Sequence, residues 1–229
     1  MEKILFRCSR LGALMTDPKL KSDKEAGNMS ETAKSFIEDK WLEETFGYKE
    51  DVITDEMLKG LMCEQDSMQL FQEVTKSGLI LKNSKHFTND YICGTPDIIN
   101  GEFVDDLKTS YTLKTFFNCE PTKDNIWQIK GYMALTGKKK GRIVYCLVPT
   151  PDELITEQKK RFYFKFNCDE QNKHYIEISE QIEKNNQIIK DLPIEKRVKI
   201  FVFEHLEYEI QNLYVKIEKA REYYNSLQL

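Results

Sequence analysis

The sequence predicts an α/β (α+β) fold, with a central mixed β-sheet flanked by helices and a helical C-terminal extension. Two strand-like runs flank Asn100-Gly101, the strongest short signal for a β-hairpin, because both central residues of a type I′ turn need positive φ. The stretch 122–136 begins at a capping residue, Thr122 or Asp124, and stops before a glycine, as helices commonly do. An apolar, strand-like run over 141–149 follows it. Strands and helices therefore alternate along the chain.

Length and composition set further bounds. The chain has 229 residues, 40% of them apolar and 31% charged, which is typical of a globular protein. We expect one domain over 1–229, with a core over about 1–149 and an extension over about 150–229 packed on it. No apolar run reaches the length of about 20 residues that spans a bilayer, and the start lacks a signal-peptide pattern. These features favour a cytoplasmic protein with no membrane partner.

Cysteine usage and charge exclude other classes. The six cysteines are scattered without a C-x-x-C spacing, which favours reduced thiols over disulfides or a zinc site. The formal net charge of −4 does not favour bulk electrostatic binding of DNA, although a local basic groove is compatible with it.

The N-terminal stretch contains a possible phosphate site. Ser9 is placed to cap a short helix over about 10–15, where Arg7 and Arg10 would meet a phosphate together with free backbone N–H groups. The alternative is a capped helix with solvated arginines. Farther along, Ser30 is expected to cap a helix that runs to about Phe46.

A second helix is predicted over 55–75, with a carboxylate inside its apolar stripe. Glu64 lies among residues that share one face by their three- and four-residue spacing, namely Met57, Leu61, Met68 and Phe71. A carboxylate on an apolar face is costly unless it is paired or binds a metal. The alternative is a glutamate at the edge of the stripe that reaches solvent.

The hairpin brings two acids and a lysine to one place. If Asn100 and Gly101 form the loop, Asp97 faces Val104, and alternation puts Asp97, Asp106 and Lys108 on one face of the sheet. Asp97 and Asp106 are then diagonal neighbours, about 7–8 Å apart. Two carboxylates at that separation can bind one hard cation such as Mg²⁺. Asp105 points to the opposite face and is expected not to be a ligand.

Polar groups after the hairpin complete the candidate site. Thr109 and Ser110 follow Lys108 directly and suit contacts to phosphate, which position nucleic acid without reading its sequence. Gln128 and Tyr132 are four residues apart and share a helix face. The basic run 138–142 is either a DNA-backbone contact or a solvated turn.

The remaining elements are predicted from their periodicity. We expect a strand over 79–87, a helix over 151–161, a short strand over 162–166, a helix over 176–189, a strand over 197–203 and a long helix over 205–227.

Several of these motifs together resemble one nuclease superfamily. Pro96-Asp97 followed by Asp106-Leu107-Lys108 resembles the PD-(D/E)XK pattern, and the element order matches its restriction-endonuclease-like core. Within the superfamily, three further segments are similar to phage recombination exonucleases of the lambda type: the start at Ser9, Gly60-x-x-x-Glu64-x-x-Ser67 and the Q-x-x-x-Y helix at Gln128. The resemblance covers 1–149. Asp106 stands where lambda-type enzymes often have glutamate, and its shorter side chain slightly shifts the expected metal position.

The resemblance implies a metal-dependent DNA exonuclease that degrades one strand of linear duplex DNA in the 5′→3′ direction during recombination. It implies Mg²⁺, two ions and replaceable by Mn²⁺, held by Asp97, Asp106, the Leu107 carbonyl and Glu64. Lys108 would orient the attacking water, with Gln128 aligning that water or Lys108 and Tyr132 supporting the helix face. It also implies a ring-shaped trimer and a single-strand annealing partner. An endonuclease of the same superfamily, restriction- or junction-type, and a DNA-binding protein that keeps only the fold are the alternatives.

Overall fold

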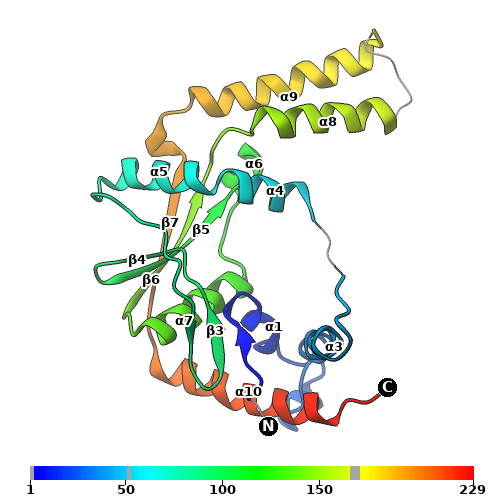
Figure 1. Ribbon diagram of the computed structural model, residues 1–229, viewed down its shortest axis with the longest axis vertical. Coiled ribbons are helices and arrows are strands. Elements are labelled where there is room, and N and C mark those ends of the chain that lie inside the picture. Colours follow the sequence, from blue (N-terminus) through cyan, green and yellow to red (C-terminus); the bar gives the residue numbers. More distant parts are fainter. Residues whose placement is uncertain (1–2, 51–52, 166–170) are drawn as a thin grey trace.

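The computed structural model describes residues 3–50, 53–165 and 171–229 (Figure 1). Among them are two sheets, a larger one with strand order β4-β5-β6-β7 and a smaller one with order β1-β3-β2. The strands are β1 (Phe6–Arg7), β2 (Phe87–Thr88), β3 (Ile92–Gly94), β4 (Ile98–Asn100), β5 (Phe103–Thr109), β6 (Lys140–Cys146) and β7 (Val198–Glu204). The expected strand over 79–87 is therefore wrong except at its last residue, since 79–86 run without regular structure.

The larger sheet is mixed, as predicted. β4 and β5 are antiparallel, β5 and β6 are parallel, and β6 and β7 are antiparallel. Parallel neighbours need a crossover between them, and the chain supplies it with two helices between β5 and β6. The part beyond residue 149 contributes β7 to this sheet as well as helices, so the sheet is complete only with the C-terminal third of the chain.

Helices cover both faces of the larger sheet. They are α1 (Leu11–Leu14), α2 (Lys21–Glu25), α3 (Glu31–Phe46), α4 (Asp55–Met62), α5 (Glu64–Thr75), α6 (Leu113–Phe117), α7 (Lys123–Thr136), α8 (Asp152–Lys165), α9 (Lys173–Asp191) and α10 (Glu207–Ser226), with 3₁₀ turns at Cys8–Arg10 and Ile194–Lys196. On one face Val104 and Ile143 pack with Ile129 and Met133 of α7. On the other, Val144 packs with α5. Side chains that alternate along β5 therefore meet α7 or α5 in turn.

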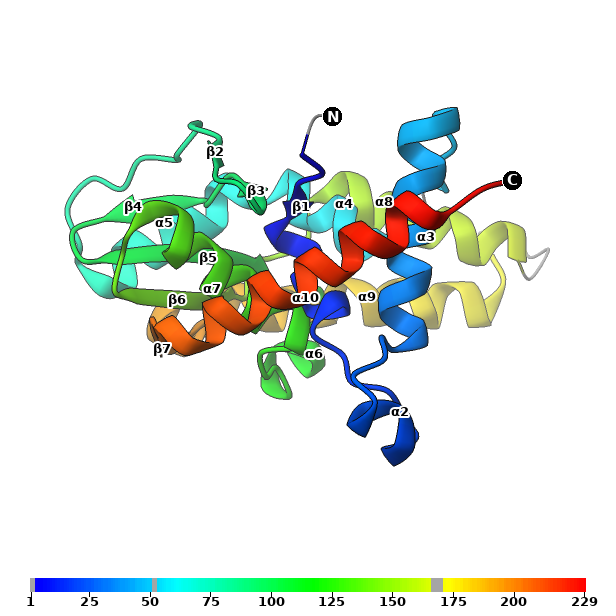
Figure 2. The ribbon, with the colours of Figure 1, turned by 90° about the horizontal axis from the view of Figure 1, so that it is seen from below.

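The C-terminal helix α10 contacts the N-terminal part of the chain. This helix contacts α1, α3 and α7 and lies across α1 and α3 in Figure 2. Arg221 of α10 donates two hydrogen bonds to the carbonyl of Ile4, at 3.0 and 2.9 Å, just before β1. Lys216 reaches the Asp17 carboxylate at 3.2 Å. The C-terminal helix therefore fixes the N-terminal strand in place.

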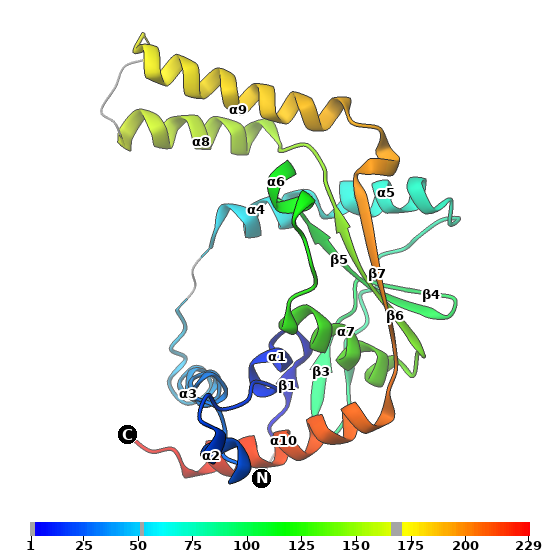
Figure 3. The ribbon, with the colours of Figure 1, turned by 180° about the vertical axis from the view of Figure 1, so that it is seen from behind.

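Helices α8 and α9 form an antiparallel pair that projects beyond the sheet, above α4 and α5 (Figures 1 and 3). Asn186 of α9 anchors the pair to the end of β6, since its side chain accepts from the Thr150 N–H at 2.7 Å and donates to the Thr150 carbonyl at 3.0 Å. The expected strand over 162–166 is wrong, because 162–165 continue α8; Phe166 lies outside the described residues. No helix among those described is both long and apolar enough to span a lipid bilayer.

The hairpin turn differs from the prediction by one position. Asn100 pairs with Phe103, so the loop residues are Gly101 and Glu102, and of the two predicted turn residues only Gly101 has positive φ, at 54°. Asn100 instead extends β4. Each residue of β4 therefore pairs with a residue of β5 two positions farther along than predicted. Because side chains alternate with a period of two, every side chain keeps its predicted face.

The single helix expected over 55–75 is also wrong, because the chain breaks at Cys63 (φ −101°, ψ 13°) into α4 and α5. The break turns α4 so that the predicted apolar stripe is exposed in its first half, with Met57 and Leu61 exposed by 59% and 74%. Lys59 is buried in their place. Its ammonium group donates a hydrogen bond to the Tyr111 carbonyl at 2.9 Å, which partly offsets the cost of burial.

Candidate active site

Strand β5 and the residue before β4 bring the two predicted aspartates together. The β4–β5 register pairs Ile98 with Asp105, so its extension by one residue places Asp97 opposite Asp106. The Asp97 carboxylate accepts a hydrogen bond from the Leu107 N–H at 2.7 Å and so takes the place of the next backbone partner in the ladder. Directly opposite residues share a face and lie closer than diagonal ones. The corrected turn therefore brings the acids closer than the predicted one.

A chain of polar contacts runs from Asp106 to helix α7. Lys108 Nζ lies 2.8 Å from Asp106 Oδ2 and donates to Gln128 Oε1 at 3.0 Å. The Gln128 amide in turn donates to the Tyr132 hydroxyl at 3.0 Å. Because Gln128 and Tyr132 are four residues apart on α7, the helix holds the amide toward the strand. The lysine is thus fixed between one carboxylate and one amide oxygen.

Burial raises the pKa of both aspartates. Asp106 is 2% exposed, and burial raises its pKa against the opposing effect of Lys108. Burial, followed by the negative charge of Asp106, raises the pKa of Asp97 to about 7. Lys108 opposes the rise in the pKa of both acids. Two carboxylates that resist simultaneous ionisation are a suitable site for a divalent cation.

Glu64 approaches these acids but pairs with a different residue. It is the first residue of α5, is half-buried, and forms an ion pair with Lys82 from the irregular segment before β2. Its charge adds slightly to the rise in the pKa of Asp97, which places it near the two aspartates. A cavity of about 660 Å³ opens beside Glu64 and Lys82, along α5. The apolar spacing of the predicted helix singled out Glu64, but it did not indicate that Lys82 would be its partner.

The donor set fits a hard cation in part. Asp106 Oδ2 is buried and accepts no well-oriented hydrogen bond from the described residues, and the carboxylate of Asp97 keeps one oxygen outside its bond to Leu107. In the described ranges, however, no three His, Cys, Asp or Glu side chains already converge as metal ligands. The aspartates therefore form a two-carboxylate pair that a third acid, Glu64, could join by leaving Lys82.

Asp105 has a structural partner, and its predicted orientation is confirmed. It is fully buried on the face of β5 opposite Asp106 and receives two hydrogen bonds from the Arg142 guanidinium, at 2.6 and 2.8 Å. Burial raises the pKa of Asp105 and the guanidinium opposes the rise. Arg142, which the sequence left as either a DNA contact or a solvated residue, instead neutralises a buried carboxylate.

The predicted phosphate site at the N-terminus has a different local structure. Ser9 lies inside a 3₁₀ turn over Cys8–Arg10, with no side-chain capping bond at either end, so its predicted role as an N-cap is wrong. The physical reason is that α1 begins only at Leu11 and is four residues long and buried. Arg7, Ser9 and Arg10 are all exposed. The turn packs against the site, since an added Cβ at Gly94 would lie 3.2 Å from Cys8 Sγ.

Thr109 and Ser110, the other predicted phosphate contacts, are placed inward. The Thr109 hydroxyl is 2.8 Å from the Ser67 hydroxyl of α5, on the face of the sheet opposite Lys108. Ser110 is 7% exposed, and its N–H donates to the Cys146 carbonyl at 2.8 Å. The structure therefore joins Asp97, Asp106, Lys108, Gln128 and Tyr132 and places Glu64 beside them. The Thr109 hydroxyl is engaged with Ser67, and Ser110 is buried.

The fold of the chain is similar to that of solved exonucleases. A phage-related exonuclease from Haemophilus somnus superposes with a TM-score of 0.75 at 23% identity, over 97% of this chain and 94% of that one. The chain has the fold of an exonuclease. An alkaline exonuclease from Laribacter hongkongensis superposes with a TM-score of 0.60 at 14% identity, over 98% of this chain and 90% of that one. The same enzyme in complex with dAMP gives a TM-score of 0.59 at 13% identity, over 97% of this chain and 88% of that one. No protein-family model and no curated protein sequence matches the chain.

Proposed function

We propose that this protein is a Mg²⁺-dependent exonuclease that degrades one strand of linear double-stranded DNA from the 5′ end. The observation that carries the proposal is the meeting of Asp97, Asp106 and Lys108 with Gln128 in one polar cluster on an exonuclease fold. The fold alone would support several functions. Asp106 is buried and Asp97 half-buried, both have raised pKa values, and a lysine is held between an acid and an amide. These features mark a functional site and suit hydrolysis of a phosphodiester.

The chain's own residues account for the other parts of the chemistry. Asp97, Asp106, the Leu107 carbonyl and Glu64 would hold one or two Mg²⁺ ions, with Mn²⁺ as a substitute. When bound, the metal supplies a Lewis acid that polarises the phosphodiester and acidifies water. Lys108 would orient the attacking water and stabilise negative charge on the phosphate, since an ammonium already fixed in place needs little reorganisation.

Gln128 keeps the Lys108 ammonium aimed at the acids, and Tyr132 keeps Gln128 from turning away. Arg7, Ser9 and Arg10, exposed beside the site, would bind the phosphate backbone of the DNA. Thr109 and Ser110 would contact phosphate only after leaving their present partners. We further propose that the enzyme acts in the cytoplasm as a trimer with a single-strand annealing protein.

An assay on labelled DNA tests the activity. Linear duplexes labelled at either end, with and without a 5′-phosphate, are incubated with Mg²⁺ or with EDTA, beside a closed circular duplex. We expect digestion only with Mg²⁺, only of linear DNA and from the 5′ end. Cleavage of the circle would show an endonuclease instead, and binding without cleavage would refute an enzyme of either kind.

Two variants locate the activity at the acids. Asp106→Asn should abolish digestion while far-UV circular dichroism stays unchanged. Glu102→Gln removes the same charge from an exposed residue in the turn of the same hairpin and should leave digestion as in the wild type. Equal activity of the Asp106 variant and the wild type would refute the site. Light scattering of the purified chain tests the trimer.

A further inference from the structure

Glu64 is placed by α5 rather than by contacts of its own with the catalytic strand. Its recorded partner is Lys82, which belongs to an irregular segment. The helix breaks just before it, at Cys63, so Glu64 is the first residue of α5. Whatever fixes the beginning of α5 against β5 therefore also sets the distance between Glu64 and the two aspartates.

Ser67 supplies one such connection. It lies one turn after Glu64, on the same side of α5, and is 1% exposed. Its hydroxyl is 2.8 Å from the Thr109 hydroxyl, and Thr109 directly follows Lys108 on β5. The Cys146 thiol, on the neighbouring strand, contacts the Ser67 carbonyl at 3.4 Å. A buried hydroxyl pair inside an otherwise apolar interface fixes one register between helix and strand, because any slide would leave both groups unsatisfied.

Lys59 supplies a second connection, from the other side of the helix break. It is 0% exposed, and its ammonium donates to the Tyr111 carbonyl at 2.9 Å. Within the described part of the chain it forms no ion pair, and burial lowers its pKa to about 8. A buried ammonium bonded to one carbonyl is costly. The bond holds the backbone three residues after Lys108 against α4.

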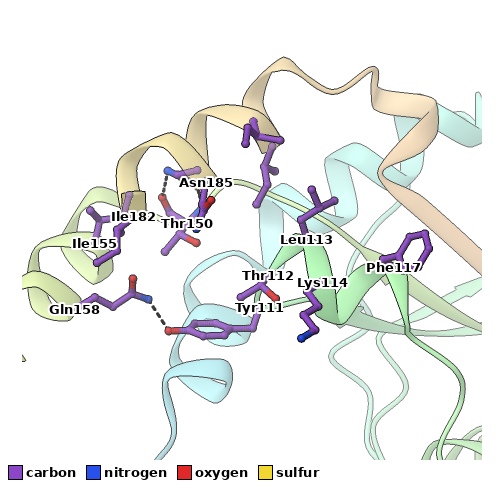
Figure 4. Close-up of a pocket in the computed structure, with 13 residues that line it drawn as sticks. Tyr111, Thr112, Leu113, Lys114, Phe117, Thr150, Ile155, Gln158, Ile182 and Asn185 are labelled. Carbon is purple, nitrogen blue, oxygen red and sulfur yellow. Dashed lines mark hydrogen bonds between the residues drawn. The ribbon is translucent and has the colours of Figure 1, made fainter. Parts of the chain in front are cut away.

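The far end of this second connection is itself fixed. The Tyr111 hydroxyl donates to Asp55 at 3.4 Å and accepts a hydrogen bond from Gln158 of α8, which points at it across a cavity of about 730 Å³ (Figure 4). Tyr111 is therefore held by α4 and by the projecting helix pair. Lys59 therefore binds a backbone that α8 also holds, through Gln158.

The two connections lie on either side of Glu64 in the sequence, and both end within three residues of Lys108. We propose that Ser67 and Lys59 are positioning residues that hold Glu64 where it can share a divalent cation with Asp97 and Asp106. The inference rests on the proposed function, since it assumes that these acids bind a metal. Neither Ser67 nor Lys59 would touch the metal or DNA. Both would act by fixing the position of Glu64.

Metal affinity measured without DNA tests this role apart from activity. Mn²⁺ binding is followed by electron paramagnetic resonance on the full chain, for Ser67→Ala, Thr109→Val and Lys59→Met. Partners that orient metal ligands typically change affinity by 10- to 100-fold, so we expect each variant to bind Mn²⁺ about tenfold more weakly. Thr109→Ser keeps the hydroxyl and should bind as the wild type does. The double variant Ser67→Ala/Thr109→Val should be no weaker than either single one, because both changes break one contact.

Leu70→Ala is the matched control for a purely structural effect. Leu70 is buried on α5 and packs on the sheet without forming either connection. Its truncation should lower the melting temperature while the folded protein keeps wild-type Mn²⁺ affinity. The contrary result is a wild type that requires a divalent metal for activity, with Ser67, Thr109 and Lys59 variants that bind Mn²⁺ as tightly as it does. That result would overturn the inference and leave the proposed function unaffected. A wild type that binds no divalent cation would overturn both.

Discussion

Replacement of Asp97 by asparagine should stabilise the metal-free protein at alkaline pH while it destroys the site. Asparagine keeps an oxygen that can accept the Leu107 N–H, so the local hydrogen bond survives. What it removes is the cost of ionising a buried acid beside Asp106. The pKa of Asp97 is raised from 3.8 to about 7. At about 1.4 kcal/mol for each pH unit, that difference corresponds to about 4 kcal/mol.

The sign of the effect depends on pH. Between about pH 4 and pH 7 the folded state binds more protons at this group than the unfolded state does, so wild-type stability falls as pH rises through that range. Above pH 7 the full cost is present. The variant lacks this cost at every pH. Because Asp97 is partly exposed and shares its charge with Asp106, we expect a gain on the order of 2–4 kcal/mol at pH 8.5 and almost none near pH 4.

Urea unfolding in EDTA, followed by far-UV circular dichroism across this range, measures the difference. Asp39→Asn removes the same charge from an exposed position on α3 and should show no comparable pH-dependent gain. Saturating Mg²⁺ should stabilise the wild type at pH 8.5 and leave Asp97→Asn unchanged, since a cation bound to the folded acids adds to stability. An Asp97→Asn protein that is no more stable than the wild type at pH 8.5 would refute the account of the aspartate pair.

Three further substitutions test other parts of the molecule. Arg142→Met leaves the buried Asp105 carboxylate unpaired and should lower the free energy of unfolding by about 3 kcal/mol in urea titrations; addition of Asp105→Asn should recover most of it, and an additive second loss would contradict this. Tyr132→Phe removes the hydroxyl that accepts from Gln128 and should lower kcat about tenfold with little change in KM, whereas an unchanged kcat would show that the amide needs no support. Gly94→Ala would place a Cβ 2.7 Å from the Tyr132 ring and should cost about 1–3 kcal/mol of stability; an unchanged melting temperature would contradict that close contact.

The sequence predicted the parts of the site that depend on local pattern. Thr122 caps α7 and Gly137, with φ 70°, ends it, which places Gln128 on the face toward β5. The grouping of Asp97 with Asp106 survived an error in the turn, because only the parity of the register decides which face a side chain takes.

The rest of the site depends on contacts between distant residues. Lys59 is buried although it lies outside the apolar stripe of the sequence, and its partner Tyr111 is 52 residues away. Periodicity assigned the stripe to one continuous helix, and no residue type near Cys63 signalled the break. Likewise, Ser67 and Thr109 are each ordinary residues in their own segments, and only the packing of α5 on the sheet pairs them.

The hydrogen bonds from Arg221 to the Ile4 carbonyl relate the order in which the chain is synthesised to the time at which the protein becomes active. Ile4 leads into β1, which pairs with β3, and β3 carries the glycine that lies against Tyr132. Arg221 leaves the ribosome after every residue of the site has been made. A nascent chain that still lacks α10 therefore lacks the hydrogen bonds that hold the residue before β1 in place. We expect the growing polypeptide to be unable to cut DNA until α10 has been made.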